Sequence, residues 1–160
     1  MDHLKKEEAI EYLYRSYASV DGLWFMKTEE LFGFEKALEI DTMVWEILPK
    51  IQSRFLKSKT GQTDGLTGLF KCFKLKLEYD GFQFKAIKNK KTIEFIISKC
   101  PWYDLLVKSK RENISKKIGS AICSKEYGVW AKEFGEEINL VLSEQLCGGC
   151  SYCRISYNIS

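Results

Sequence analysis

Three cysteines lie close together near the end of the chain, in the motif Cys147-x2-Cys150-x2-Cys153. A spacing of two residues lets neighbouring thiolates reach one metal ion at about 2.3 Å, and a glycine pair between the first two cysteines permits a tightly curved backbone. Two earlier cysteines, Cys100 and Cys123, are candidate partners of this cluster. We predict that the fold brings these five thiols together as a site for a soft metal.

Zinc is the metal that best suits three or four cysteine ligands. An iron–sulfur cluster is the less favoured alternative, because the two-residue spacings do not follow the fuller ferredoxin pattern. A thiol–disulfide pair, or separate thiols without a common role, are further interpretations. The only histidine is His3, so a Cys–His nucleophile pair would depend on the extreme N-terminus. Which of the three terminal cysteines bind the metal stays open.

The composition is typical of one globular domain spanning residues 1–160. Hydrophobic residues make up 45% and aromatic residues 14%, which excludes extensive disorder. A net charge of +3 is too small to indicate a nucleic-acid-binding surface. Neither a targeting sequence nor a membrane-spanning run of apolar residues is recognisable, so we expect a cytoplasmic protein. Clustered cysteines in a reducing cytoplasm favour metal ligands over structural disulfides.

The elements that must position the cysteines follow from the hydrophobic periodicity. A long helix is expected from about Lys5 to about Leu31, followed after Gly33 by a second helix that is kinked near Trp45 or broken by Pro49. These two helices should form a hairpin. Further helices and strands are then expected as helix 66–77, strands 82–87 and 92–97, helix 102–108, helical pieces 113–122 and 124–134, and strands 138–144 and 152–159.

This order predicts an α+β domain, in which an N-terminal helical hairpin and further helices pack on a four-stranded antiparallel sheet. Cys100 falls at the end of the second strand. Cys123 falls between the two helical pieces, with Ser124 as the N-cap of the second piece. A pocket for an apolar molecule between the helices and the sheet is expected to be lined by Asp21, Trp24, Trp45, Trp102 and Tyr127.

The residues Cys100-Pro101-Trp102, then Cys123, then the terminal cluster before the last strand carry a family resemblance. The chain resembles 4-vinyl reductase domain proteins and is similar to L-2-amino-thiazoline-4-carboxylate hydrolase-like proteins. The resemblance implies the α+β fold shared by nitric-oxide-sensing haem domains and vesicle-tethering subunits. It also implies a ligand cavity between helices and sheet, and zinc held by Cys100, Cys123 and the terminal cluster.

The leading functional hypothesis is a homodimeric, zinc-containing domain that binds a small apolar molecule or hydrocarbon, in a sensory or accessory role. The first alternative is a zinc-dependent hydrolase that opens a small heterocyclic ring, with Asp21 or Glu126 as the base. A scaffold or tethering subunit is the second alternative.

Overall fold

The computed structural model describes residues 4–160, and His3 lies outside the described residues. The chain divides into two compact units, Met1–Asp41 and Thr42–Ser160. The N-terminal unit consists of helix α1 (Lys6–Phe32) and the first part of α2 (Phe34–Trp45). Gly33 separates the two helices with a φ of 85°, in the left-handed region that favours glycine. The expected long first helix is therefore confirmed.

The second expected helix is broken into two. Helix α2 ends at Trp45, and α3 (Leu48–Thr60) begins after Ile47 with Pro49 in its first turn. A proline is tolerated in a first turn, where its missing N–H would have no partner, but it cannot continue a helix from the preceding residues. The break that Pro49 predicted is confirmed.

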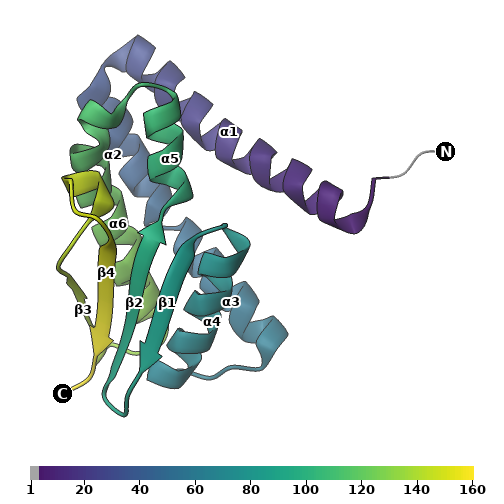
Figure 1. Cartoon of the computed structure of the whole chain (residues 1–160), viewed down its shortest axis with the longest axis vertical. Coiled ribbons are helices and arrows are strands. Elements are labelled where there is room, and N and C mark those ends of the chain that lie inside the picture. Colours follow the sequence, from purple (N-terminus) through teal and green to yellow (C-terminus); the bar gives the residue numbers. More distant parts are fainter. Residues whose placement is uncertain (1–3) are drawn as a thin grey trace. The chain divides into compact units, whose positions relative to one another are not determined.

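The C-terminal unit is built on a four-stranded antiparallel sheet in the order β1-β2-β4-β3, which confirms the expected fold class (Figure 1). Its strands are β1 (Gln83–Lys88), β2 (Thr92–Lys99), β3 (Asn139–Leu142) and β4 (Cys153–Asn158). The central strands β2 and β4 are paired so that Ile93 lies opposite Tyr157 and Ile97 opposite Cys153. The sheet therefore joins the middle of the chain to its end.

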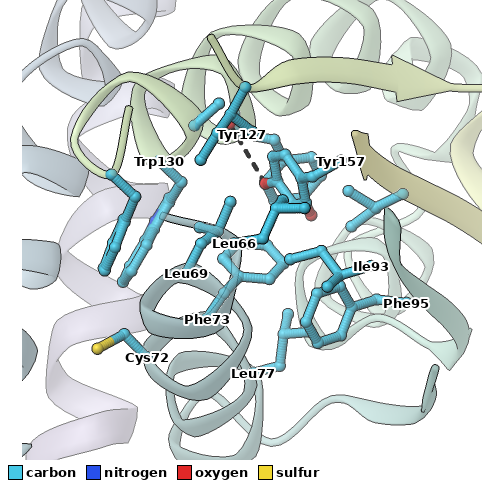
Figure 2. Packing of buried hydrophobic residues seen from close by; sticks show 14 of the residues in the cluster. Leu66, Leu69, Cys72, Phe73, Leu77, Ile93, Phe95, Tyr127, Trp130 and Tyr157 are labelled. Atoms are coloured by element: carbon cyan, nitrogen blue, oxygen red, sulfur yellow. Dashed lines mark hydrogen bonds between the residues drawn. The ribbon is translucent and has the colours of Figure 1, made fainter. Parts of the chain in front are cut away.

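Helix α4 (Leu66–Tyr79) lies against the sheet and supplies the centre of the core. The ring of Phe73 makes edge-on contacts with the rings of Phe95, Tyr127, Trp130 and Tyr157, at centroid distances of 5.0 to 5.6 Å (Figure 2). Each such pair contributes about 0.5–1.5 kcal/mol beyond the burial of its surface. These contacts connect α4, α6 and both central strands.

Helix α5 (Pro101–Lys108) follows β2, and a 3-10 turn (Glu112–Ile114) leads into α6 (Ser115–Lys132). The expectation of two helical pieces meeting at Cys123 was wrong, because α6 is continuous through Cys123 and Ser124 caps nothing. The physical reason is that one buried face runs along the whole helix, from Ser115 and Gly119 to Tyr127 and Trp130. Burial of that face outweighs the low helix propensity of the glycines within it.

Candidate metal centre

One end of the sheet carries Cys100 and Cys153. Cys153 is the first residue of β4 and is paired with Ile97 of β2. Cys100 follows the last residue of β2 and directly precedes Pro101, which starts α5. Because β2 and β4 are adjacent antiparallel strands, the last residue of β2 and the first residue of β4 lie at the same end of the sheet.

Helix α6 brings Cys123 to the turn that precedes β4. Gly119 lies one helical turn before Cys123, and the Sγ atom of Cys147 sits so close to Gly119 that a Cβ atom there would lie 2.1 Å from it. The hydroxyl of Ser115, a further turn back, donates a hydrogen bond of 3.1 Å to the carbonyl oxygen of Cys147. Ser115, Gly119 and Cys123 recur every four residues, so one face of α6 holds the turn.

The turn η2 (Leu146–Gly148) positions the three terminal thiols, those of Cys147, Cys150 and Cys153. The backbone N–H of Leu146 donates to the Sγ atom of Cys153 at 3.2 Å, and the N–H of Cys150 donates to the carbonyl of Gln145 at 3.1 Å. Gly149 ends the turn with a φ of 93°. The side chain of Cys150 is exposed, whereas Cys147 and Cys153 are half-buried. All six cysteines are free thiols.

The thiols are close enough to affect one another electrostatically. Burial raises the pKa of Cys123 well above its ordinary value, and negative charge on Glu126, Cys100, Cys147 or Cys153 raises it further. Burial also raises the pKa of Cys100 to about 12, against the opposing effect of the backbone amides at the start of α5. The thiols of Cys147 and Cys153 have raised pKa values for the same primary reason, burial. Without a cation the cluster is therefore a group of neutral, protonated thiols.

A buried ion network lies beside this cluster. The Nζ atom of Lys76 is 2.5 Å from Oε1 of Glu126 and 3.3 Å from Oδ2 of Asp80, and the Lys76 side chain is only 2% exposed. Burial by itself would lower the pKa of Lys76, but the charges of Glu126 and Asp80 outweigh burial and raise it. Glu126 follows Cys123 by three residues on α6, and its negative charge raises the pKa of Cys123. The positive charge of Lys76 lowers the pKa of Cys100 and so opposes the larger effect of burial.

Lys76 and Asp80 were not predicted from the sequence as residues near the site. The available signal was position, because Lys76 follows Cys72 and Phe73 by four and three residues on the apolar stripe of α4, where a lysine needs a buried partner. Asp80, four residues further on, is one such partner.

The structure brings together Cys100, Cys123, Cys147 and Cys153 and leaves Cys150 at the rim, where it interacts with the last two. Within residues 4–160, no three histidine, cysteine or acidic side chains stand at the mutual distances of ligands around an ion. The sixth cysteine, Cys72, is a separate core residue on α4, with its sulfur 3.7 Å from the Thr60 hydroxyl.

The residues expected to line a pocket fall in both units. Asp21 and Trp24 belong to the N-terminal unit: Trp24 is 72% exposed, and burial raises the pKa of Asp21 to about 6. Trp45, Trp102 and Tyr127 belong to the C-terminal unit. Trp45 is buried with its ring edge-on to that of Trp102 at a centroid distance of 5.6 Å, and Tyr127 is part of the aromatic core around α4. A shared pocket remains a prediction.

These features define a small α+β protein with a cluster of partly buried cysteines at one end of its sheet. The chain belongs to DUF6125, a family of unknown function, which matches residues 2–144. The matched part includes Cys100 and Cys123 and ends before Cys147. No curated protein and no solved structure matches the chain. The resemblance to 4-vinyl reductase domains therefore remains a prediction. In the described part of the chain, no helix is long and apolar enough to cross a membrane.

Proposed function

We propose that the protein is a zinc-binding domain in which Cys100, Cys123, Cys147 and Cys153 hold one structural Zn²⁺ ion. The observation that carries the proposal is that four thiols from four separate elements lie around one end of the sheet. Cys153 at the start of β4 is paired with Ile97, three residues before Cys100, and Cys147 of turn η2 lies against Gly119, one helical turn before Cys123 on α6.

Zinc fits the chemistry of this cluster. Thiolate sulfur is a soft ligand, and a closed tetrahedral set of four thiolates is a common structural zinc site. Binding would release the four thiol protons and leave a zinc–tetrathiolate centre with a net charge of −2, in which the dication offsets half of the thiolate charge. The N–H of Leu146 donates a hydrogen bond to the Sγ atom of Cys153, which would hold this sulfur in a fixed orientation toward the ion.

The ion would tie the C-terminal hairpin to the rest of the C-terminal unit. Strand β3 has four residues and lies at an edge of the sheet, so few backbone hydrogen bonds hold it. A closed zinc site linking η2 and β4 to α6 and the end of β2 adds a restraint that does not depend on apolar burial. A closed four-thiolate site would leave no coordination position for the water that a zinc-dependent hydrolase activates, so the proposal and this alternative are mutually exclusive.

Metal analysis of the purified full chain tests this proposal. We expect about one equivalent of zinc per chain by mass spectrometry, and replacement of zinc by Co²⁺ should give the absorption bands of tetrahedral cobalt–thiolate coordination. Cys123→Ser should lose most of the metal. Two matched controls, Cys72→Ser in the core and Cys150→Ser at the rim, should retain it.

Three results would count against the proposal. Absence of bound metal in protein prepared with zinc would exclude the site. A brown protein with acid-labile sulfide would show an iron–sulfur cluster instead. Loss of metal in Cys150→Ser but not in Cys147→Ser would show that the wrong terminal thiol has been assigned.

A further inference from the structure

Helix α1 carries an exposed apolar stripe. The stripe consists of Ile10, Leu13, Val20, Trp24 and Leu31, which are between 52% and 75% exposed. These five positions follow a heptad pattern of alternating three- and four-residue steps, in which Tyr17 and Lys27 occupy the intermediate places. At 100° per residue they fall within an arc of about 80° and extend over about 30 Å of helix. We call these five residues the α1 stripe.

A second side of α1, about 110–130° around the helix from the stripe, has its own apolar contacts. Ala18 is buried, and the ring of Phe25 lies edge-on to that of Phe34 at a centroid distance of 6.0 Å. Helix α1 is thus apolar on two sides, of which the second is partly covered and the stripe is exposed. The ion pair between Glu11 and Arg15 lies outside the arc of the α1 stripe. An exposed stripe of this length on a soluble helix marks an interaction surface.

We propose that the α1 stripe pairs with the α1 stripe of a second copy of this chain, in an antiparallel two-helix seam. The three–four spacing is self-complementary, because apolar residues at heptad positions a and d of one helix insert between those of an identical helix. The exposed parts of the five side chains amount to roughly 600 Å² per copy, near the about 800 Å² that each partner buries in a standard interface. Complete burial of both stripes would remove roughly 1,200 Å² in total, the lower limit of a standard interface, which suits a reversible dimer.

Two lysines determine the direction of the pairing. Lys6 and Lys27 both fall at d positions of the heptad that contains the stripe. In a parallel dimer each lysine would lie beside the same lysine of the other copy, and only Lys27 has a carboxylate partner, Glu30, on its own helix. In the antiparallel arrangement each lysine lies opposite a different part of the partner helix. The charge pattern thus favours the antiparallel seam.

The oligomeric state of the full chain tests this inference. Sedimentation over a range of concentrations should show a reversible dimer. Val20→Asp and Trp24→Asp should each raise the dissociation constant of the dimer by about 30-fold or more, because each change puts a charge into both halves of a two-fold seam. Ile51→Asp on α3 is the matched control, since Ile51 is equally exposed and apolar but lies outside the α1 stripe. It should leave the dimer intact.

The direction can be tested on the unmodified sequence. An amine-reactive cross-linker applied to a mixture of ¹⁴N- and ¹⁵N-labelled chains should give links between Lys6 of one copy and Lys27 of the other. Links between two Lys6 residues and between two Lys27 residues would indicate a parallel seam. A chain that remains monomeric at hundreds of micromolar, or a dimer that Ile51→Asp disrupts as strongly as Val20→Asp, would overturn the proposal. Zinc content is an independent readout, because it should not change in any of these variants.

Discussion

Gly119→Ala is the most incisive test of the thiol cluster, because α6 contains two glycines in very different surroundings. A Cβ atom at position 119 would lie 2.1 Å from Sγ of Cys147 and 3.0 Å from its Cβ. A Cβ atom at position 128 would have no heavy atom within 4 Å. Both substitutions change a helix-interior glycine to alanine, so their difference isolates the contact with Cys147.

The magnitude follows from these distances. Nonbonded heavy atoms prefer a separation of about 3.5–4.0 Å, so the Cys147 sulfur would have to move by at least about 1.4 Å. Gly128→Ala should raise the free energy of unfolding by about 0.5–1 kcal/mol through helix propensity. Gly119→Ala gains the same amount but loses about 1–3 kcal/mol to overpacking. We therefore expect Gly119→Ala to be less stable than Gly128→Ala by about 1–3 kcal/mol.

The same displacement should weaken zinc binding. Metal–ligand distances tolerate deviations of only about 0.2 Å, so a sulfur that is pushed away must turn or leave the ion. We expect a loss of about 10-fold or more in zinc affinity for Gly119→Ala and no loss for Gly128→Ala. Urea unfolding of the metal-free chains and competition with a zinc chelator measure the two effects. If Gly119→Ala is as stable as Gly128→Ala and binds zinc equally well, Cys147 does not sit against α6 as described.

Three further predictions concern buried charge. Lys76→Met should lower the free energy of unfolding by about 3–5 kcal/mol, because Glu126 and Asp80 lose their buried cation; chemical denaturation measures this. Asp21→Asn should stabilise the protein above pH 6 by about 1–2 kcal/mol, after allowance for partial exposure, as measured by thermal unfolding. The raised pKa of Asp21 contributes stability that is complete below pH 3.8 and is lost as pH rises through about 6, and the asparagine variant should lack this slope. Zinc affinity, measured by chelator competition, should fall as pH is lowered, because protons compete for the buried thiols.

Each of these three has a clear contrary result. Adding Glu126→Gln to Lys76→Met should recover part of the lost stability, and an unchanged loss would mean that unpaired negative charge is not its cause. A wild-type stability that is flat between pH 3.8 and about 6, relative to Asp21→Asn, would show that Asp21 is not buried as described. A zinc affinity that does not depend on pH would mean that the ligands are already thiolates without metal.

Local pattern was sufficient to predict most of the secondary structure. The apolar periodicity of α1 and α4, the break introduced by Pro49 and the alternation in β1 and β2 all depend on residues within one or two turns of each other. The same reasoning placed Cys100 at the end of a strand, because Pro101 cannot continue a sheet. It failed at Cys123, where burial of one continuous face made α6 a single helix. The helix propensity of neighbouring residues does not show that a helix face is buried by elements from other parts of the chain.

By itself, then, the sequence determined the elements and the presence of a cysteine motif with the spacing of a metal site. Only the tertiary structure decided which thiols meet. Register between β2 and β4 sets Cys153 near Cys100, and contact of Gly119 with Cys147 seats the terminal turn on α6. The pairing of Lys76 with Glu126 also joins residues 50 positions apart. Such contacts depend on how separate elements pack, and packing between distant segments leaves no periodic signal in the chain.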